Sequence, residues 1–253
     1  MLQAMALLNP EQLTGRARDH VQEWQPLQCT LHPDTARAFA ALREAAQEAG
    51  LELVAASGFR DFDRQLRIWN DKYLGRRPLL DPLGQALDPR VMTAPQIVQA
   101  ILHWSALPGA SRHHWGTEID VFDRAGLTPG QQPQLIPAEY AAEGPFGRLD
   151  RWLSEHAEGF GFFRPYDRDR GGVQPEPWHL SYAPVSSAAL AALSIEVLSE
   201  ALEGVELAGA EAVRPQLADI HARYVCAVAA PSKQALAAPR LRAARVSPAT
   251  RSS

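Results

Sequence analysis

Ser111-Arg112-His113-His114-Trp115-Gly116-Thr117-Glu118-Ile119-Asp120 is the stretch around which this chain is organised. It places histidine and aspartate, two residue types that bind metal ions, on either side of a glycine. A second stretch, Glu176-Pro177-Trp178-His179, offers another histidine and another carboxylate. A catalytic zinc ion takes three ligands from histidine, aspartate, glutamate and cysteine and keeps a fourth position open. The two stretches together therefore predict a catalytic zinc site.

We expect His113, Asp120 and His179 to be the three ligands. Two neutral imidazoles and one carboxylate leave the ion with a net positive charge, which lowers the pKa of a bound water to about 7. Glu176 is the candidate for the base that takes the proton from this water. Pro177 excludes a regular helix between Glu176 and His179, and in a straight strand these two side chains would face opposite ways. We therefore expect a bend or bulge between Glu176 and His179. The three ligands and the base together suggest a metallopeptidase.

Three sequence blocks carry a family resemblance. Ser-x-His-x-x-Gly-x-x-x-Asp at 111–120, followed by Glu-x-x-His at 176–179 with Trp178 before the histidine, resembles the zinc D-alanyl-D-alanine carboxypeptidases of the VanY type. Ser57-Gly58-Phe59-Arg60, with Gln65 after it, is similar to the upstream substrate-binding motif of that family. The blocks occur in the family's order over roughly residues 30–185, and three ordered blocks are a specific signal.

The resemblance implies a small α+β fold, shared with lysostaphin-type enzymes and the hedgehog signalling domain. In that fold helices flank a small antiparallel sheet, which would hold one zinc ion per chain. The resemblance further implies that Arg60 steadies the oxyanion or the substrate carboxylate, since a guanidinium is a planar fork of donors. Ser111, Gln65 and Ser57 would bind substrate. Taken alone, Arg60 would be interpreted as part of a surface ion pair and Gln65 as a solvated helix residue.

Glu118 departs from the family pattern, which usually has a small residue at this position. In an extended segment Glu118 shares a face with Asp120, so it either perturbs the site or supports a metal ligand by hydrogen bonding. Trp178 is a second candidate for such a supporting position. His114 follows His113 directly, and neighbours on an extended chain point opposite ways, so we expect only His113 to reach the metal.

The composition is that of an ordinary folded protein. The 253 residues are 46% hydrophobic and 21% charged, which favours one domain with an appendage. The net charge of −4, without a basic stripe before the C-terminus, argues against nucleic acid as a partner. Cys29 and Cys226 are expected to be buried thiols, and a disulfide between them stays open.

The N-terminal residues do not form a convincing signal peptide. Residues 1–8 are apolar but lack a basic region and are followed by Asn9-Pro10-Glu11. No apolar run approaches membrane-spanning length. We therefore expect a cytoplasmic protein without a membrane partner, or a periplasmic one if a leader was removed, and the sequence leaves the oligomeric state open.

The motifs fall within a predicted catalytic domain over residues 1–185, which includes an N-terminal helix beginning at Asn9-Pro10 and carrying Leu13 to Trp24 on one side. A helical hairpin is expected over 186–230, where it could cover the sheet, dimerise or restrict substrate entry. A disordered basic tail is expected over 231–253. Further helices are predicted at 33–49, 61–74, 94–105, 137–143 and 146–157. Strands are predicted at 51–56 and 117–122, residues 159–163 are expected to lead into another strand, and the strand that carries His179 is expected to end at 182.

These features lead to three functional hypotheses. The leading one is a zinc-dependent carboxypeptidase that removes the C-terminal D-amino acid, D-alanine, from peptidoglycan stem peptides or precursors, by Glu-assisted attack of zinc-bound water. A zinc-containing module that binds cell-wall peptides without cutting them is an alternative, against which Glu176 argues. A peptidoglycan endopeptidase is the other, disfavoured because Arg60, Gln65 and Ser111 suit a free carboxylate. Motifs of other hydrolases and of nucleotide-binding proteins are absent from the sequence, and DD- versus LD-specificity stays open.

Overall fold

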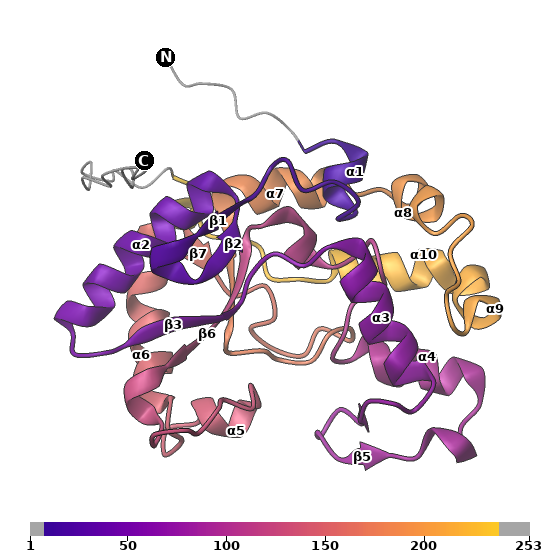
Figure 1. Ribbon diagram of the computed structural model, residues 1–253, viewed down its shortest axis with the longest axis horizontal. Helices are drawn as coiled ribbons and strands as arrows, with labels where there is room; N and C mark the ends of the chain where they lie inside the picture. The colour runs from indigo at the N-terminus through magenta and orange to yellow at the C-terminus, as the bar shows by residue number, and fades with distance from the viewer. Residues whose placement is uncertain (1–7, 238–253) are drawn as a thin grey trace, which may run out of the picture.

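The computed structural model of the protein describes residues 8–237. A four-stranded antiparallel sheet lies at its centre (Figure 1). The strand order is β3-β6-β8-β7. The architecture is therefore α+β with a small antiparallel sheet, as the resemblance implied. The strands are β3 (Leu53–Ser57), β6 (Glu118–Asp123), β7 (Phe162–Phe163) and β8 (His179–Tyr182).

The alternation of side chains along β6 gives the sheet one apolar and one polar face. Ile119 and Val121 join a hydrophobic cluster that includes Phe39 and Leu42 of α2 (Pro33–Glu48). Glu118 and Asp120 point to the opposite face, because successive residues of a strand alternate sides. Helices α2 and α6 (Gly147–His156) lie on the apolar side, and the polar face is left for the candidate site (Figure 1).

Strand register brings the motif blocks at 111–120 and 176–179 together. Asp120 of β6 is opposite His179 of β8, and Glu118 is opposite Ser181. The bend expected between Glu176 and His179 is a turn, closed by a hydrogen bond from the His179 N–H to the Glu176 carbonyl at 3.1 Å. In a straight strand the side chains of Glu176 and His179 would face opposite ways. The turn instead brings Glu176 next to His179 at the start of β8.

A second hydrophobic cluster lies beside the sheet, around α3 (Phe62–Tyr73) and α4 (Ala94–Leu102). Where a helical hairpin was expected, the chain forms several short helices in two arms, called here the C-terminal hairpin (Figure 1). Its arms meet where His221 hydrogen-bonds the Leu193 carbonyl at 2.7 Å. Residues of this hairpin, among them Leu198 and Val213, belong to the same cluster as α3 and α4. The hairpin helices are α7 (Ala183–Ala192), α8 (Ile195–Ala201), α9 (Ala210–Val213) and α10 (Leu217–Ile220).

The N-terminal helix is shorter than the sequence pattern predicts. Helix α1 covers only Pro10–Leu13, and Trp24 lies instead in β1 (Gln22–Trp24), paired with β2 (Cys29–Leu31). Gly15 ends the helix with a φ of +74°, and a Cβ there would overlap the ring of His114. The chain packs directly against His114 at this point, so only a residue without a side chain fits at position 15.

Two smaller expectations need correction. Residues 231–237, expected in a disordered tail, contain α11 (Lys233–Leu236) with Ala235 fully buried. The rest of the predicted basic tail and most of the N-terminal apolar stretch fall at residues 238–253 and 1–7, which lie outside the described residues. Cys29 is buried, whereas Cys226 is exposed, and both are free thiols. The remaining elements are α5 (Pro137–Tyr140) and a small hairpin of β4 (Leu79–Leu80) and β5 (Ala86–Leu87).

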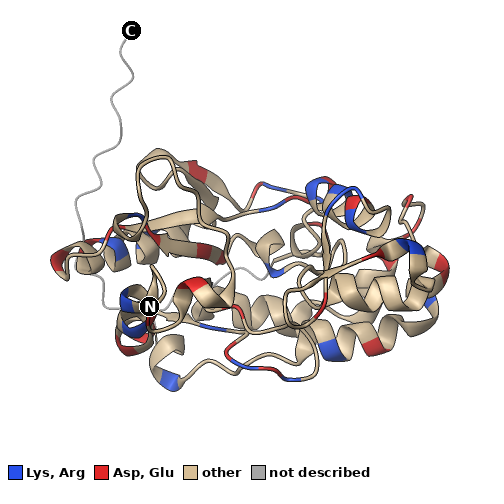
Figure 2. Ribbon diagram, turned by 90° about the horizontal axis from the view of Figure 1, so that it is seen from below, with Lys and Arg blue, Asp and Glu red and all other residues tan. Residues whose placement is uncertain are grey.

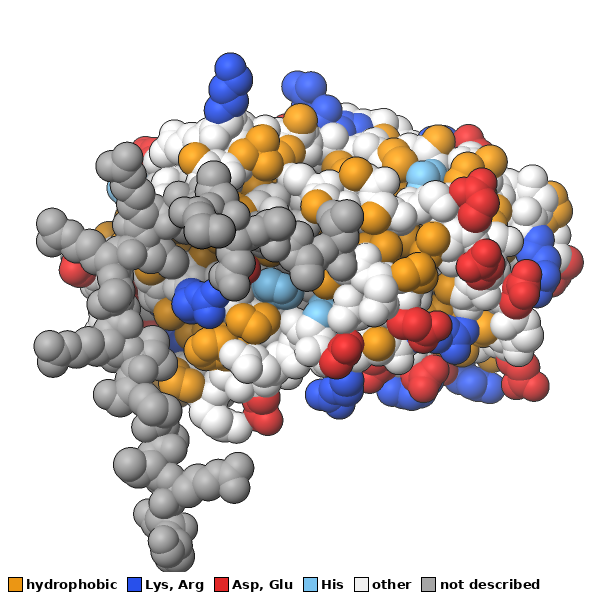
Figure 3. All heavy atoms as spheres, turned by 90° about the horizontal axis from the view of Figure 1, so that it is seen from above, with side chains coloured by type: hydrophobic (Ala, Val, Ile, Leu, Met, Phe, Trp, Pro, Cys, Tyr) orange, Lys and Arg blue, Asp and Glu red, His pale blue; other side chains and the backbone are white. Residues whose placement is uncertain are grey.

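Charged residues are mixed over the surface. Figure 2 shows acidic and basic residues near each other at both ends of the molecule, and Figure 3 shows them side by side at its right-hand end. Among residues 8–237, no helix is both long and apolar enough to cross a bilayer.

Candidate metal centre

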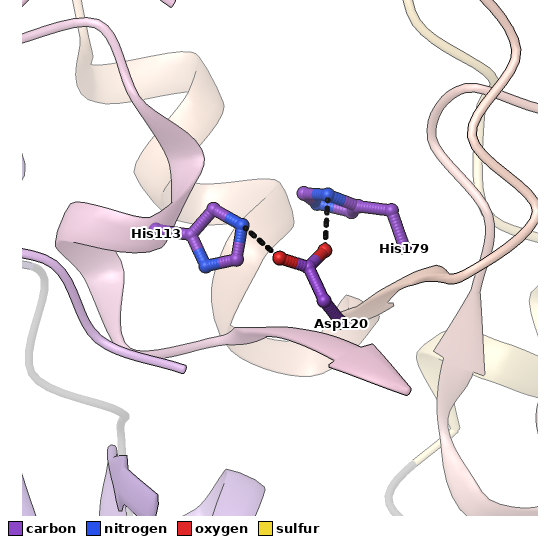
Figure 4. Close-up of side chains that lie close together, drawn as sticks. All are labelled: His113, Asp120 and His179. Atoms are coloured by element: carbon purple, nitrogen blue, oxygen red, sulfur yellow. Dashed lines mark ion pairs between the residues drawn. The ribbon is translucent and has the colours of Figure 1, made fainter. Parts of the chain in front are cut away.

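His113, Asp120 and His179 converge from three different elements (Figure 4). His113 lies in the single 3-10 turn Arg112–Trp115, which Gly116 ends with a φ of +68°. Asp120 is in the middle of β6, and His179 begins β8. One ligand atom from each of the three side chains lies within 4.8 Å of the others, and all three residues are buried. The structure thus brings together the three residues that the sequence proposes as ligands.

Hydrogen bonds to the far side of each imidazole leave one ring nitrogen facing Asp120. His113 Nδ1 donates to the Gly58 carbonyl at 2.7 Å, and its Nε2 lies 3.4 Å from Asp120 Oδ2. His179 Nε2 donates to Glu118 Oε2 at 2.7 Å, and its Nδ1 lies 3.3 Å from Asp120 Oδ1. Bonds of this kind fix the tautomer and orientation of metal-binding histidines. Two lone pairs and one carboxylate therefore face a common point.

The residues present fit a divalent cation. Asp120 Oδ1 is buried and has no hydrogen-bond partner among residues 8–237, which is costly for a carboxylate oxygen without a cation. Burial lowers the pKa of His113 to about 4, so this ring is neutral as a ligand must be. Around His179, the carboxylates of Asp120, Glu118 and Glu176 outweigh burial and raise its pKa. The site therefore attracts positive charge, and its donor set is that of a catalytic zinc.

Glu176 lies next to the three candidate ligands. Its Oε2 is 3.2 Å from His179 Nδ1, and the side chain lines the same cavity as His113 and Asp120. Burial raises the pKa of Glu176, with Asp120 adding to this and His179 opposing it. A carboxylate whose pKa lies closer to neutrality is better suited to take up and return a proton.

The upstream block reaches the site through Arg60. This side chain lines the cavity, and its Nη1 donates to Gln65 Oε1 at 2.8 Å. Gln65 is fully buried and donates in turn to the Ala106 carbonyl at 2.7 Å, so it orients Arg60 and does not line the cavity. Ser111 lines the cavity, whereas Ser57 lies at a bulge of β3 opposite Asp120 and does not. In this arrangement Arg60 and Ser111 can therefore contact a substrate in the cavity, whereas Gln65 and Ser57 cannot.

A cavity of about 510 Å³ opens over these residues. This volume lies in the range of small-ligand sites, roughly 300–1,000 Å³. Leu80 and Leu83 of the β4–β5 hairpin form one wall, and Leu135 and Ile136 form another. Trp178, one of the residues expected to support the site, also contributes to the lining. The cavity thus combines apolar walls with a polar floor that holds the candidate ligands, which suits a peptide with a charged end.

Several residues that shape the site carry no signal in the sequence. Tyr166 packs its ring against His179 at 5.0 Å between centroids, and burial raises its pKa to about 12. The Glu139 carboxylate accepts the N–H groups of Gln134 and Leu135 and so holds the wall at residues 134–136. Arg112 pairs with Glu118 at 3.3 Å. The Arg112–Glu118 spacing across a glycine turn is the one feature that could have suggested an ion pair.

Comparisons with known proteins identify a family. A family model described as VanY, D-alanyl-D-alanine carboxypeptidase, matches residues 28–185. An uncharacterized protein of Haemophilus influenzae is 39% identical over 121 residues, which cover 47% of this chain and 92% of that protein. A D-alanyl-D-alanine carboxypeptidase of Enterococcus faecalis is 27% identical over 150 residues, covering 58% of this chain and 46% of that protein.

Among solved structures, a vancomycin-resistance D,D-pentapeptidase VanY variant in complex with Zn(II) is similar to this chain at 21% identity. The TM-score is 0.46, and the match covers 76% of this chain and 88% of that chain.

Proposed function

The chain belongs to the VanY family of D-alanyl-D-alanine carboxypeptidases, and from this membership we propose that it is a zinc-dependent enzyme acting on peptidoglycan stem peptides or their precursors. It would remove the C-terminal D-amino acid, D-alanine. The observation that carries the proposal is the convergence of His113, Asp120 and His179 beside Glu176 on the floor of one cavity.

The protein's own residues divide the work. A bound zinc ion supplies Lewis acidity, which polarises the scissile carbonyl and lowers the pKa of water. Glu176 takes the proton of the attacking water and returns it to the leaving amine, since it lies next to the ligands and burial raises its pKa. Arg60 stabilises the negative charge that develops on the carbonyl oxygen or is present on the terminal carboxylate.

Recognition of a chain end explains why a cation and a hydroxyl line the same cavity. Arg60 is held at a fixed place by Gln65, and Ser111 lies in the cavity next to the Arg112–Trp115 turn. A free carboxylate is matched by a guanidinium fork and a hydroxyl donor. An endopeptidase substrate has an amide at this position and would leave Arg60 without a partner charge, which favours the exopeptidase.

Defined muropeptides test the proposal. The zinc-loaded protein is incubated with a pentapeptide stem ending in D-Ala-D-Ala, a tetrapeptide stem ending in a single D-Ala, and a cross-linked dimer, and products are identified by mass spectrometry. We expect free D-alanine from one of the two stems, which also decides between DD- and LD-specificity. Release from neither stem, with the metal content verified, overturns the proposal, and cleavage of the dimer alone identifies an endopeptidase.

Replacement of Glu176 separates the enzyme from a pure binding module. Glu176→Gln should reduce turnover by about 10²- to 10⁴-fold while zinc content and peptide binding are retained, because only proton transfer is removed. Glu200→Gln, on the exposed surface of α8, is the matched control and should leave turnover unchanged. If wild type and Glu176→Gln bind peptide alike and neither releases D-alanine, the protein is a binding module.

A further inference from the structure

A buried polar cluster lies behind His179, on the side away from Asp120. At its centre is Glu118, which is fully buried and does not line the cavity. Its Oε2 accepts the Nε2–H of His179 at 2.7 Å. Its Oε1 accepts hydrogen bonds from Thr117 Oγ1 at 2.8 Å, Ser181 Oγ at 2.8 Å and Arg112 Nη2 at 3.3 Å. The carboxylate is thus bonded on both oxygens without touching the space where a substrate would lie.

The charge of this cluster is balanced within the protein. Arg112 is 3% exposed, and its Nη2 contacts both Glu118 and Ser181, the latter at 2.7 Å. The guanidinium of Arg112 thus lies beside the Glu118 carboxylate and compensates its charge. A carboxylate accepts hydrogen bonds and donates none, so each of these contacts is one that Glu118 accepts.

Strand register makes the contact between Glu118 and His179 a fixed one. Glu118 and Asp120 share the polar face of β6, and their partners on β8 are Ser181 and His179. The imidazole of His179 therefore lies between two carboxylates, with Nε2 towards Glu118 and Nδ1 towards Asp120. A 180° flip of the ring would turn carbon atoms towards both carboxylates and remove both contacts, so the observed orientation is the one that satisfies them.

We infer that Glu118 is a positioning residue of the metal centre: it holds the proton of His179 on Nε2, so that Nδ1 is the metal-binding atom, and it increases the affinity for a divalent cation. This inference rests on the proposed function only in so far as that function requires a metal. Carboxylates that accept the second N–H of a metal-bound histidine raise its basicity as a ligand, and their loss typically weakens metal binding by about 10- to 100-fold. Arg112 acts through Glu118, because its Nη2 holds Glu118 Oε1 and Ser181 Oγ on the side away from His179.

Zinc affinity of the full chain, measured by competition with a chromophoric chelator, tests the inference without any substrate. Glu118→Gln keeps the shape and a hydrogen-bond acceptor but removes the negative charge, and we expect its zinc affinity to fall by about tenfold or more. Glu118→Ala also removes the acceptor and should lose more, but it leaves Arg112 unpaired and its folding must be verified by circular dichroism. Asp123→Asn alters a buried carboxylate at the end of β6 that accepts the N–H groups of Glu52 and Ala125 and does not line the cavity, and it should bind zinc as the wild type does.

The position of the imidazole proton gives a second readout. In zinc-loaded wild-type protein, long-range nitrogen-15 spectra of His179 should show the proton on Nε2. Unchanged zinc affinity in folded Glu118→Gln, or a proton on Nδ1 of His179, overturns the inference. Wild-type protein that binds no zinc would instead contradict the proposed function, so the two failures are distinguishable.

Discussion

The adjacent histidines His113 and His114 point in different directions and make different contacts. His113 faces Asp120, whereas His114 Nδ1 donates to the Arg60 carbonyl at 2.6 Å and its Nε2 accepts the Gly109 N–H at 3.2 Å. Burial lowers the pKa of His114 to about 3, so the ring is neutral and both nitrogens are satisfied. His114 therefore ties the backbone of Arg60 to the metal-binding turn, and does not compete for the ion.

Replacement of His114 should impair catalysis without removing the metal. His114→Ala leaves the Arg60 carbonyl without its donor, so we expect about 1–3 kcal/mol loss of folding stability and a fall in kcat/KM as Arg60 becomes less fixed. Denaturant unfolding measures the loss of stability, and D-alanine release measures the fall in kcat/KM. Zinc stoichiometry shows whether the metal is retained. His156→Ala, at an exposed site on α6, is the control. A variant that loses its zinc but keeps the position of Arg60 would contradict this division of tasks.

Lys72 makes the free energy of unfolding depend on pH in the alkaline range. Its ammonium donates to Ser105 Oγ at 2.7 Å, and burial lowers its pKa to about 8 from 10.5. Below pH 8 the group is charged in both states, and its burial destabilises the fold. Between pH 8 and 10.5 only the unfolded chain keeps the proton, so stability rises with pH.

Denaturant unfolding of wild type and Lys72→Met at pH 7.5 and pH 10 measures this effect. The stability of wild type relative to the variant should rise by about 2 kcal/mol over that interval. A difference that stays constant or falls would show that Lys72 keeps an ordinary pKa.

At the scale of elements, the loop before Glu176 is held by the C-terminal hairpin. In residues 164–174, the Gly171 carbonyl accepts the Nε–H of Arg223 at 3.0 Å, and the Gln174 N–H donates to the His103 carbonyl at 3.0 Å. Gly172 packs so closely that a Cβ would overlap the carbonyl oxygen of Arg223. The hairpin therefore fixes the segment that leads into the turn at Glu176.

Gly172→Ala should displace this loop. The added methyl group forces Gly172 and Arg223 apart, and a displacement of about 1 Å near the site can reduce turnover by about 100-fold. Zinc affinity should change little, because no candidate ligand lies in the loop. Gly159→Ala is the control, since a Cβ there would lie at an ordinary 3.6 Å from Gln234 Nε2. Equal turnover in both variants would show that the hairpin does not position Glu176.

Elements with a clear sequence period were predictable, and those set by distant contacts were not. The alternation around Asp120 predicted β6 and the shared face of Glu118. The three-residue strands β1 and β2 are too short to show a period, and α1 ends early because Gly15 meets His114. The sequence named the candidate ligands, but the facing atom of each imidazole depends on Gly58 and Glu118, which are far from His113 and His179 along the chain.

At the scale of the whole molecule, the segments that carry the site contribute to two hydrophobic clusters. One lies under the apolar face of the sheet, and the other joins α3 and α4 to the C-terminal hairpin. Strands β6 and β8 belong to the first cluster through Ile119 and Leu180, and the metal-binding turn belongs to the second through Trp115. The C-terminal hairpin therefore shares a core with this turn and with α3, and this core extends beyond the residues matched by the family model.

Leu198→Ala tests whether the hairpin is part of the common core. Leu198 is fully buried in the second cluster, so its truncation should destabilise the protein by about 2–5 kcal/mol in denaturant unfolding. Leu74→Ala removes a side chain that is 54% exposed and should change stability by less than about 0.5 kcal/mol. If unfolding shows two separate transitions and Leu198→Ala affects only one, the hairpin folds independently.

The position of the metal tests the central claim most directly. Crystals of the zinc-loaded protein, measured at the zinc absorption edge, should show one anomalous peak per chain, about 2.0–2.2 Å from His113 Nε2, a carboxylate oxygen of Asp120 and His179 Nδ1. One coordination position should be free of protein atoms and face the cavity beside Glu176. A peak away from these three residues, or a fourth protein ligand that closes the open position, would contradict the account.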